Sequence, residues 1–100
     1  MFIAGLSTYI AEKNYLLAMH RSWAAENAAF KITSNCVSPG FMLTHLNEST
    51  DERIIENMEL QHPLKKLLDT KTTAECVITL INSSVYLNGQ NIFINSTLSL

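Results

Sequence analysis

A tyrosine and a lysine four residues apart, Tyr9 and Lys13, are the side chains in this sequence best suited to chemistry. On a helix with about 3.6 residues per turn they lie on nearly the same face, so a phenol and an ammonium share one patch of surface. A nearby ammonium favours the phenolate, which lets the hydroxyl donate and recover a proton near neutrality. The pair is therefore a candidate acid/base unit. The structural alternative is an ordinary surface pair, because this spacing arises often by chance on amphipathic helices.

A second candidate group follows a strand-like segment. Residues 31 to 38 include buried-type side chains and run into Pro39-Gly40, with Thr44 four residues after the glycine. Proline supplies no N–H donor and glycine permits close backbone approach. The carboxyl end of such a strand is a place where a flat ligand can lie against the main chain.

The order of these motifs resembles the short-chain dehydrogenase/reductase family. In that family a Tyr-x-x-x-Lys helix precedes a strand carrying Asn-x-Val-x-Pro-Gly, with a threonine four residues after the glycine. The matching residues here are Asn35, Val37, Pro39, Gly40 and Thr44. The stretch from Tyr86 to Ile94, with Gly89-Gln90 before an apolar strand, is similar to the family's closing loop and last strand. The similarity spans residues 7 to 95, and it weakens after the strand, where Asn95 and Ser96 stand in place of the usual glycine pair.

The resemblance implies roles for these residues. Tyr9 would be the general acid/base, and Lys13 would favour the phenolate while binding the nicotinamide ribose hydroxyls. The residues that would line the nicotinamide side are Pro39, Gly40, Met42 and Thr44. The implied cofactor is NAD or NADP, and the implied reaction is hydride transfer between a carbonyl and an alcohol, which protein side chains cannot perform alone.

Several motifs of the resembled family have no counterpart here. They are the glycine-rich phosphate loop, the ribose-selecting residue, the Asn-Ala-Gly segment and the catalytic serine. We therefore expect a truncated chain that corresponds to the C-terminal part of the family's fold, inactive alone and a doubtful binder of the cofactor. The expected fold class is α/β, a single partial Rossmann-like domain over residues 1–100. It would be part of a doubly wound parallel sheet with flanking helices and without the N-terminal nucleotide-binding half.

Composition limits the classes of function. The 100 residues are enough for one small domain, with 47% apolar residues, 16% charged residues and a net charge of −2. No basic cluster extends beyond Lys65-Lys66, so nucleic acid is not an expected partner. No apolar run is long enough for a membrane span and no secretion signal is evident, so we expect a cytoplasmic protein that does not bind membranes. No zinc or other metal site is expected, because His20, His45 and His62 lie far apart in sequence without ligands at a suitable spacing.

Hydrophobic periodicity predicts the elements that would position these residues. A long helix from Tyr9 to Phe30, capped by Ser7 or Thr8, carries the Tyr-Lys pair and an apolar stripe containing Leu16, Met19, His20, Trp23 and Ala24. Strands are expected over residues 31 to 38 and 92 to 94. Two further helices are expected, one from Asp51 to about Leu60 with Asp51 or Thr50 as its cap, and one from Thr73 to Asn82 with a capping pattern at Thr72-Thr73-Ala74-Glu75.

Two hypotheses for function remain open at this point. The first is a short-chain dehydrogenase-type oxidoreductase part that becomes active when the missing half is supplied. The second is a non-catalytic fragment that forms a homo-oligomer through the helix from Tyr9 to Phe30, where small and apolar residues would pair with another copy. The substrate is not indicated by any motif.

Overall fold

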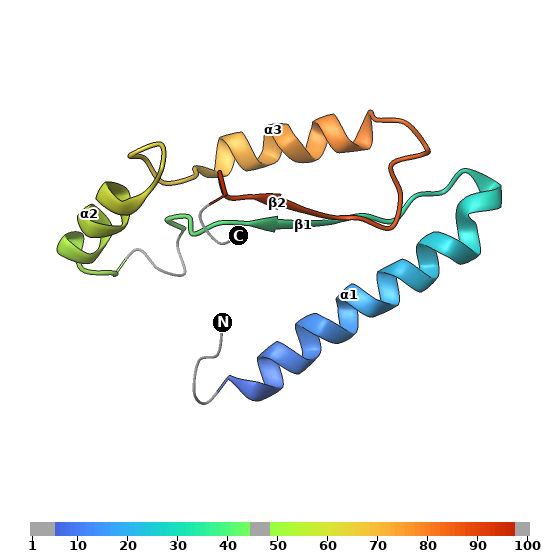
Figure 1. Ribbon diagram of the computed structural model, residues 1–100, viewed down its shortest axis with the longest axis horizontal. Helices are drawn as coiled ribbons and strands as arrows, with labels where there is room; N and C mark the ends of the chain where they lie inside the picture. The colour runs from blue at the N-terminus through green and yellow to red at the C-terminus, as the bar shows by residue number, and fades with distance from the viewer. Residues whose placement is uncertain (1–5, 45–48, 98–100) are drawn as a thin grey trace. The chain divides into compact units, whose positions relative to one another are not determined.

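The computed structural model describes residues 6–44 and 49–97 of this α/β chain. The chain divides into two compact units. The first unit contains the chain up to Cys36 together with Ser84–Ile92. The second contains Val37–Ser83 and the chain from Phe93 onward. Figure 1 shows the order of the elements along the chain.

The longest element is α1, Ser7–Asn27, in the first unit. It is continued by a 3₁₀ turn, η1, Ala28–Phe30, and ends where Lys31 adopts a left-handed conformation and donates its N–H to Ala28 O. The absence of glycine and proline from this stretch explains its length. The expected cap by Ser7 or Thr8 is wrong, because Leu6 occupies the cap position and no side chain caps the helix. Among the described helices, none is long and apolar enough to cross a bilayer.

The buried face of α1 is narrower than the apolar stripe predicted from the sequence. His20 and Ala24 are buried, whereas Leu16 and Trp23 are each 49% exposed. Ala24 Cβ lies 3.5 Å from the position that a Cβ on Gly89 would occupy, and Gly89 has a φ of 73°. His20 Nδ1 lies 3.3 Å from Ser34 O. Because a carbonyl oxygen can only accept, His20 donates from Nδ1. Within the described residues, its buried Nε2 has no hydrogen-bond partner.

Asparagine side chains join the distant segments of the first unit. Asn88 accepts a hydrogen bond from Ser34 N at 2.9 Å through Oδ1 and donates to Ala24 O at 3.1 Å through Nδ2. Asn35 donates to Leu87 O at 2.9 Å and accepts from Gln90 N at 3.1 Å. These amides satisfy backbone groups that a longer strand would have paired with its neighbour. The segment before Cys36 is therefore held by these side chains together with one backbone bond, from Gly89 N to Ser34 O at 2.9 Å.

The two strands are short and parallel. β1 is Cys36–Pro39 and β2 is Asn91–Ile94, and they are hydrogen-bonded neighbours in a two-stranded sheet (Figure 1). Cys36 N donates to Gln90 O in the first unit, and Gly40 N donates to Ile94 O in the second, so residue numbers rise in the same direction on both strands. The strand predicted over residues 31 to 38 therefore begins later than expected and includes Pro39.

The second unit contains α2, Glu52–Gln61, and α3, Thr70–Ile81. Asp51 caps α2 by accepting from Arg53 N at 2.8 Å, which confirms one of the two predicted caps. The capping pattern predicted at Thr72–Glu75 is wrong. Asp69 caps α3 instead, accepting from Thr72 N at 2.6 Å, and the helix begins three residues earlier than expected. This backbone hydrogen bond is the main reason that the pKa of the Asp69 carboxyl is lowered from its ordinary value.

Candidate functional site

The acid/base pair predicted from the sequence lies on α1. Lys13 Nζ is 5.3 Å from the centre of the Tyr9 ring, which places the ammonium over the face of the phenol. The Tyr9 side chain is 56% exposed and Lys13 is also exposed, so both polar ends are open to a ligand. The structure therefore brings these two residues together, one helical turn apart, as their spacing predicts.

The other predicted site residues follow one another at the end of β1, in the second unit. Gly40 donates its N–H to Ile94 O at 2.8 Å, so this backbone donor is already engaged by β2. A Cβ added to Gly40 would lie 3.4 Å from Asn95 Cβ, an ordinary contact distance, so this space does not by itself require glycine. Met42 is half-buried, and its sulfur lies 3.0 Å from Thr73 Oγ1 on α3. Pro39 is exposed and Thr44 is half-buried.

These observations bear on whether the residues fit a nicotinamide nucleotide. An exposed ammonium and an exposed phenol are suitable donors for ribose hydroxyls and for a reacting oxygen. The residues from Pro39 to Thr44 form a second group, in the second unit. There Met42 contacts Thr73 of α3, and Gly40 bonds to Ile94 of β2.

No metal site is indicated, because the described ranges contain no cluster of three or more histidine, cysteine, aspartate or glutamate side chains.

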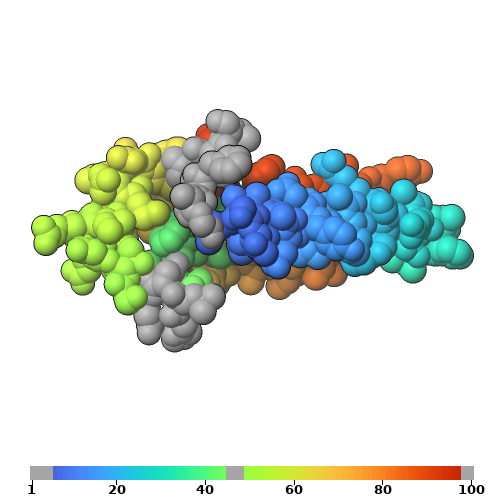
Figure 2. Space-filling model, turned by 90° about the horizontal axis from the view of Figure 1, so that it is seen from below, coloured from blue at the N-terminus to red at the C-terminus, as the bar shows by residue number. Residues whose placement is uncertain are grey.

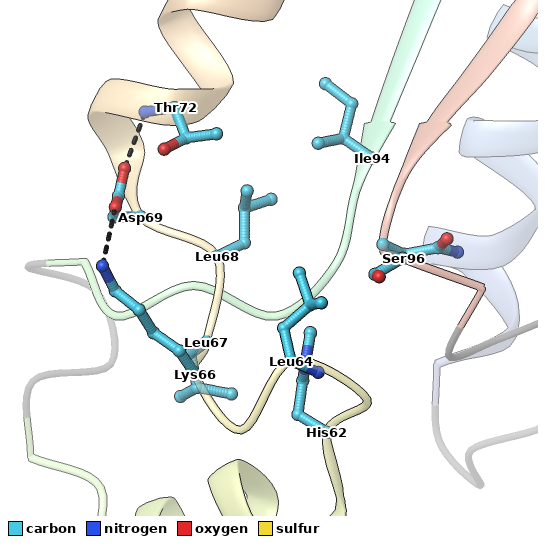
Figure 3. A pocket seen from close by; sticks show the side chains of 10 residues that line it. His62, Leu64, Lys66, Leu67, Leu68, Asp69, Thr72, Ile94 and Ser96 are labelled. Atoms are coloured by element: carbon cyan, nitrogen blue, oxygen red, sulfur yellow. Dashed lines mark hydrogen bonds and ion pairs between the residues drawn. The ribbon is translucent and has the colours of Figure 1, made fainter.

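A pocket in the second unit was missed by sequence reasoning. It lies where the segment before α3 meets the end of β2, and Figure 3 shows its lining side chains. The residues that line it are His62, Leu64, Lys66, Leu67, Leu68, Asp69, Thr72, Ile94, Asn95 and Ser96. The available signal was the leucine-rich run from Leu64 to Leu68, which contains the chain's one adjacent lysine pair. The periodicity of this leucine run indicated only a further helical turn.

Comparison with known proteins gives consistent matches over nearly the whole chain. A family model described as enoyl-(acyl carrier protein) reductase matches residues 1–98. The 3-oxoacyl-[acyl-carrier-protein] reductase FabG of Buchnera aphidicola subsp. Schizaphis graminum is 34% identical over 92 residues, covering 91% of this chain and 38% of that protein. Nodulation protein G of Rhizobium sp. (strain N33) is 29% identical over 97 residues, covering 96% of this chain and 40% of that protein. The chain thus spans about two-fifths of the length of these relatives.

Solved structures give the same result for the fold. A protein described as a gluconate dehydrogenase of Agrobacterium tumefaciens superposes with a TM-score of 0.77 at 27% identity, over 100% of this chain and 41% of that one. YwfH, an NADPH-dependent reductase involved in bacilysin biosynthesis, superposes with a TM-score of 0.72 at 24% identity, over 87% of this chain and 38% of that one. At 24% identity, the second match is evidence for the fold alone.

Proposed function

Because the chain belongs to the short-chain dehydrogenase/reductase family, we propose that it supplies the Tyr-Lys part of a nicotinamide-dependent oxidoreductase that interconverts a carbonyl and an alcohol. The observation that carries this proposal is the pairing of Tyr9 with Lys13 on the exposed surface of α1. The relatives are more than twice as long as this chain. The activity therefore belongs to a completed fold, in which residues 1–100 are the C-terminal part of one Rossmann-like domain.

Proton transfer is the chemical step that this chain performs in the proposed reaction. NAD(P)H, when bound, would supply the hydride for the reduction, and NAD(P)+ would accept it in the reverse direction. The Tyr9 hydroxyl donates its proton to the carbonyl oxygen, which becomes the alcohol, and the resulting phenolate recovers a proton from solvent. In the reverse direction the phenolate removes the proton of the alcohol. The Lys13 ammonium stabilises the phenolate through its charge.

Lys13 and the residues at the end of β1 have binding roles in this proposal. The Lys13 ammonium donates to the ribose hydroxyls next to the nicotinamide, which fixes the ring relative to Tyr9. In the completed fold, Pro39, Gly40, Met42 and Thr44 line the nicotinamide side. The contact between Met42 and Thr73 and the bond from Gly40 to Ile94 support this role, because they restrain the backbone after β1.

Complementation with the missing part of the fold tests the proposal. The chain should be co-expressed with the N-terminal three-fifths of a FabG relative, and NADH and NADPH should be titrated by calorimetry. We expect cofactor binding by the complex and none by either part alone, because the phosphate-binding loop of the family lies in the added part and the proposed ribose and nicotinamide contacts lie in this chain. We also expect the 100-residue chain alone to show no turnover of carbonyl compounds. A stable complex that binds neither nucleotide would contradict the proposal.

The exposed surface of α1 favours a second candidate function, assembly with another copy of the chain. Tyr9, Leu16 and Trp23 recur at seven-residue steps and therefore follow one side of α1, each about half exposed. The surface of this helix can be followed in blue to cyan in Figure 2. Such apolar stripes often mark protein interfaces. Because the stripe includes Tyr9, a partner bound along it would cover the proposed acid/base residue, so the two functions compete for one surface.

Sedimentation velocity tests this second function. If the stripe is an interface, the chain should sediment as a dimer or larger species at tens of micromolar, an order of magnitude at which even weak interfaces form. Leu16→Lys should then shift the chain to monomer by placing a charge in the apolar contact. Ile81→Lys, at an exposed position on α3, is the matched control and should leave the association unchanged. A monodisperse monomer before any substitution would exclude this function.

A further inference from the structure

The pocket of the second unit combines apolar walls with a polar rim. Its volume is about 300 Å³, at the lower end of the range for small-molecule sites. Leu64, Leu67, Leu68 and Ile94 provide the apolar walls (Figure 3). The polar groups around them are His62, Lys66, Asp69, Thr72, Asn95 and Ser96. The hydrogen bonds that these groups already make restrict what the pocket can bind.

His62 is the buried polar residue of the pocket, with 6% of its surface exposed. Its Nδ1 atom lies 3.0 Å from the backbone nitrogen of Leu64. A backbone N–H can only donate, so Nδ1 accepts and the proton of the neutral imidazole is carried by Nε2. The ring therefore has a donor, and not an acceptor, left for any further partner.

Two further acceptor atoms around the pocket are also used by backbone groups. Asp69 Oδ1 accepts from Thr72 N at 2.6 Å as the cap of α3. Asn95 Oδ1 accepts from Thr97 N at 3.0 Å, which directs the two N–H groups of its amide away from that bond. In each case a local backbone N–H uses one acceptor oxygen of the side chain, and the second oxygen of Asp69 faces Lys66.

Lys66 adds a positive charge to this donor-rich rim. Its Nζ atom lies 3.9 Å from Asp69 Oδ2, at the limit of an ion pair, and the Lys66 side chain is largely exposed while that of Asp69 is about half exposed. A pair of this kind contributes little stability in water. The ammonium has three donors, so it can serve Asp69 and a ligand oxygen simultaneously.

We propose that this pocket binds a small amphipathic carboxylate. The carboxylate oxygens accept from Lys66 Nζ at the rim, and the alkyl part lies on the leucine and isoleucine walls. A cationic head group at the same place is repelled by the Lys66 ammonium. The site does not depend on the proposed oxidoreductase activity, because none of its lining residues is among the proposed acid/base or nicotinamide-lining residues.

Binding of sodium hexanoate to the full 100-residue chain tests the proposal, with hexan-1-ol and n-hexylamine as matched ligands. Methyl signals of Leu68 and Ile94 should shift saturably with hexanoate in NMR titrations, while those of Leu16 and Ile78, outside the pocket, should not. We expect hexanoate to bind roughly tenfold more tightly than hexan-1-ol, because charge-assisted hydrogen bonds are the stronger kind. Hexylamine should bind more weakly than either.

Two lysine substitutions test whether hexanoate binding depends on the lysine of the pocket or on the overall positive charge of the chain. Lys66→Gln should weaken hexanoate binding roughly threefold to tenfold and leave hexan-1-ol binding unchanged. Lys71→Gln removes the same charge from the first turn of α3, outside the pocket lining, and should change hexanoate binding by less than roughly twofold. Equal affinities for hexanoate and hexan-1-ol would overturn the proposal. Equal effects of the two substitutions, or the absence of saturable shifts at Leu68 and Ile94, would overturn it as well.

Discussion

Replacing Tyr9 by phenylalanine in the completed fold should lower turnover by about two to four orders of magnitude, the usual contribution of a positioned acid/base group. The substitution removes only the hydroxyl, so the ring remains under the Lys13 ammonium and cofactor affinity should change little. Steady-state rates and nucleotide titrations on the complemented protein give both quantities. Tyr15→Phe removes the same group from an exposed position on the same helix and should leave the rate unchanged.

Lys13→Ala should behave differently, because the ammonium serves both the phenol and the ribose in the proposed site. Cofactor affinity and rate should both fall, whereas Tyr9→Phe affects the rate alone. This contrast separates the two roles within one pair of variants. If both variants lost cofactor affinity equally, the assignment of proton transfer to Tyr9 and ribose binding to Lys13 would be wrong.

The second large effect is expected on stability, from Asn88→Ala. The Asn88 amide satisfies Ser34 N and Ala24 O, which lie 54 and 64 positions before it in the sequence. Alanine leaves both partly buried backbone groups without this partner, at a cost of about 2 kcal/mol in the free energy of unfolding. For a small chain this is a large share of the total stability. Urea unfolding followed by circular dichroism measures the change.

Asn14→Ala is the matched control for this prediction. Asn14 donates to Ile10 O on the exposed surface of α1, a bond within one helical turn. Alanine is a better helix former than asparagine, so the free energy of unfolding should change by less than about 0.5 kcal/mol. Similar losses in the two variants would show that Asn88 does not join the segments of the first unit as described.

Local sequence was enough to identify the elements and the chemical pair. A stretch without glycine or proline predicted α1, and a four-residue spacing placed Tyr9 and Lys13 on one face of it. Asp51 was recognisable as a cap because its position before an apolar helix is a local signal. The Pro39-Gly40 step was recognisable at the end of a strand. These features depend on neighbours within one or two turns, which the sequence displays directly.

The strand length, the buried face of α1 and the pocket depend on contacts between residues that are distant in the sequence. The strand over residues 31 to 38 was shortened because Asn35 and Asn88 bond segments more than fifty positions away, and no periodicity encodes that choice. Within the described residues, the buried face of α1 is limited to His20 and Ala24, where the segments around Ser34 and Gly89 contact the helix. The pocket, likewise, exists because the run from His62 to Asp69 meets the end of β2. Backbone hydrogen-bonding groups must be satisfied wherever the folded chain places them, so their partners follow from the path of the chain and not from adjacent residues.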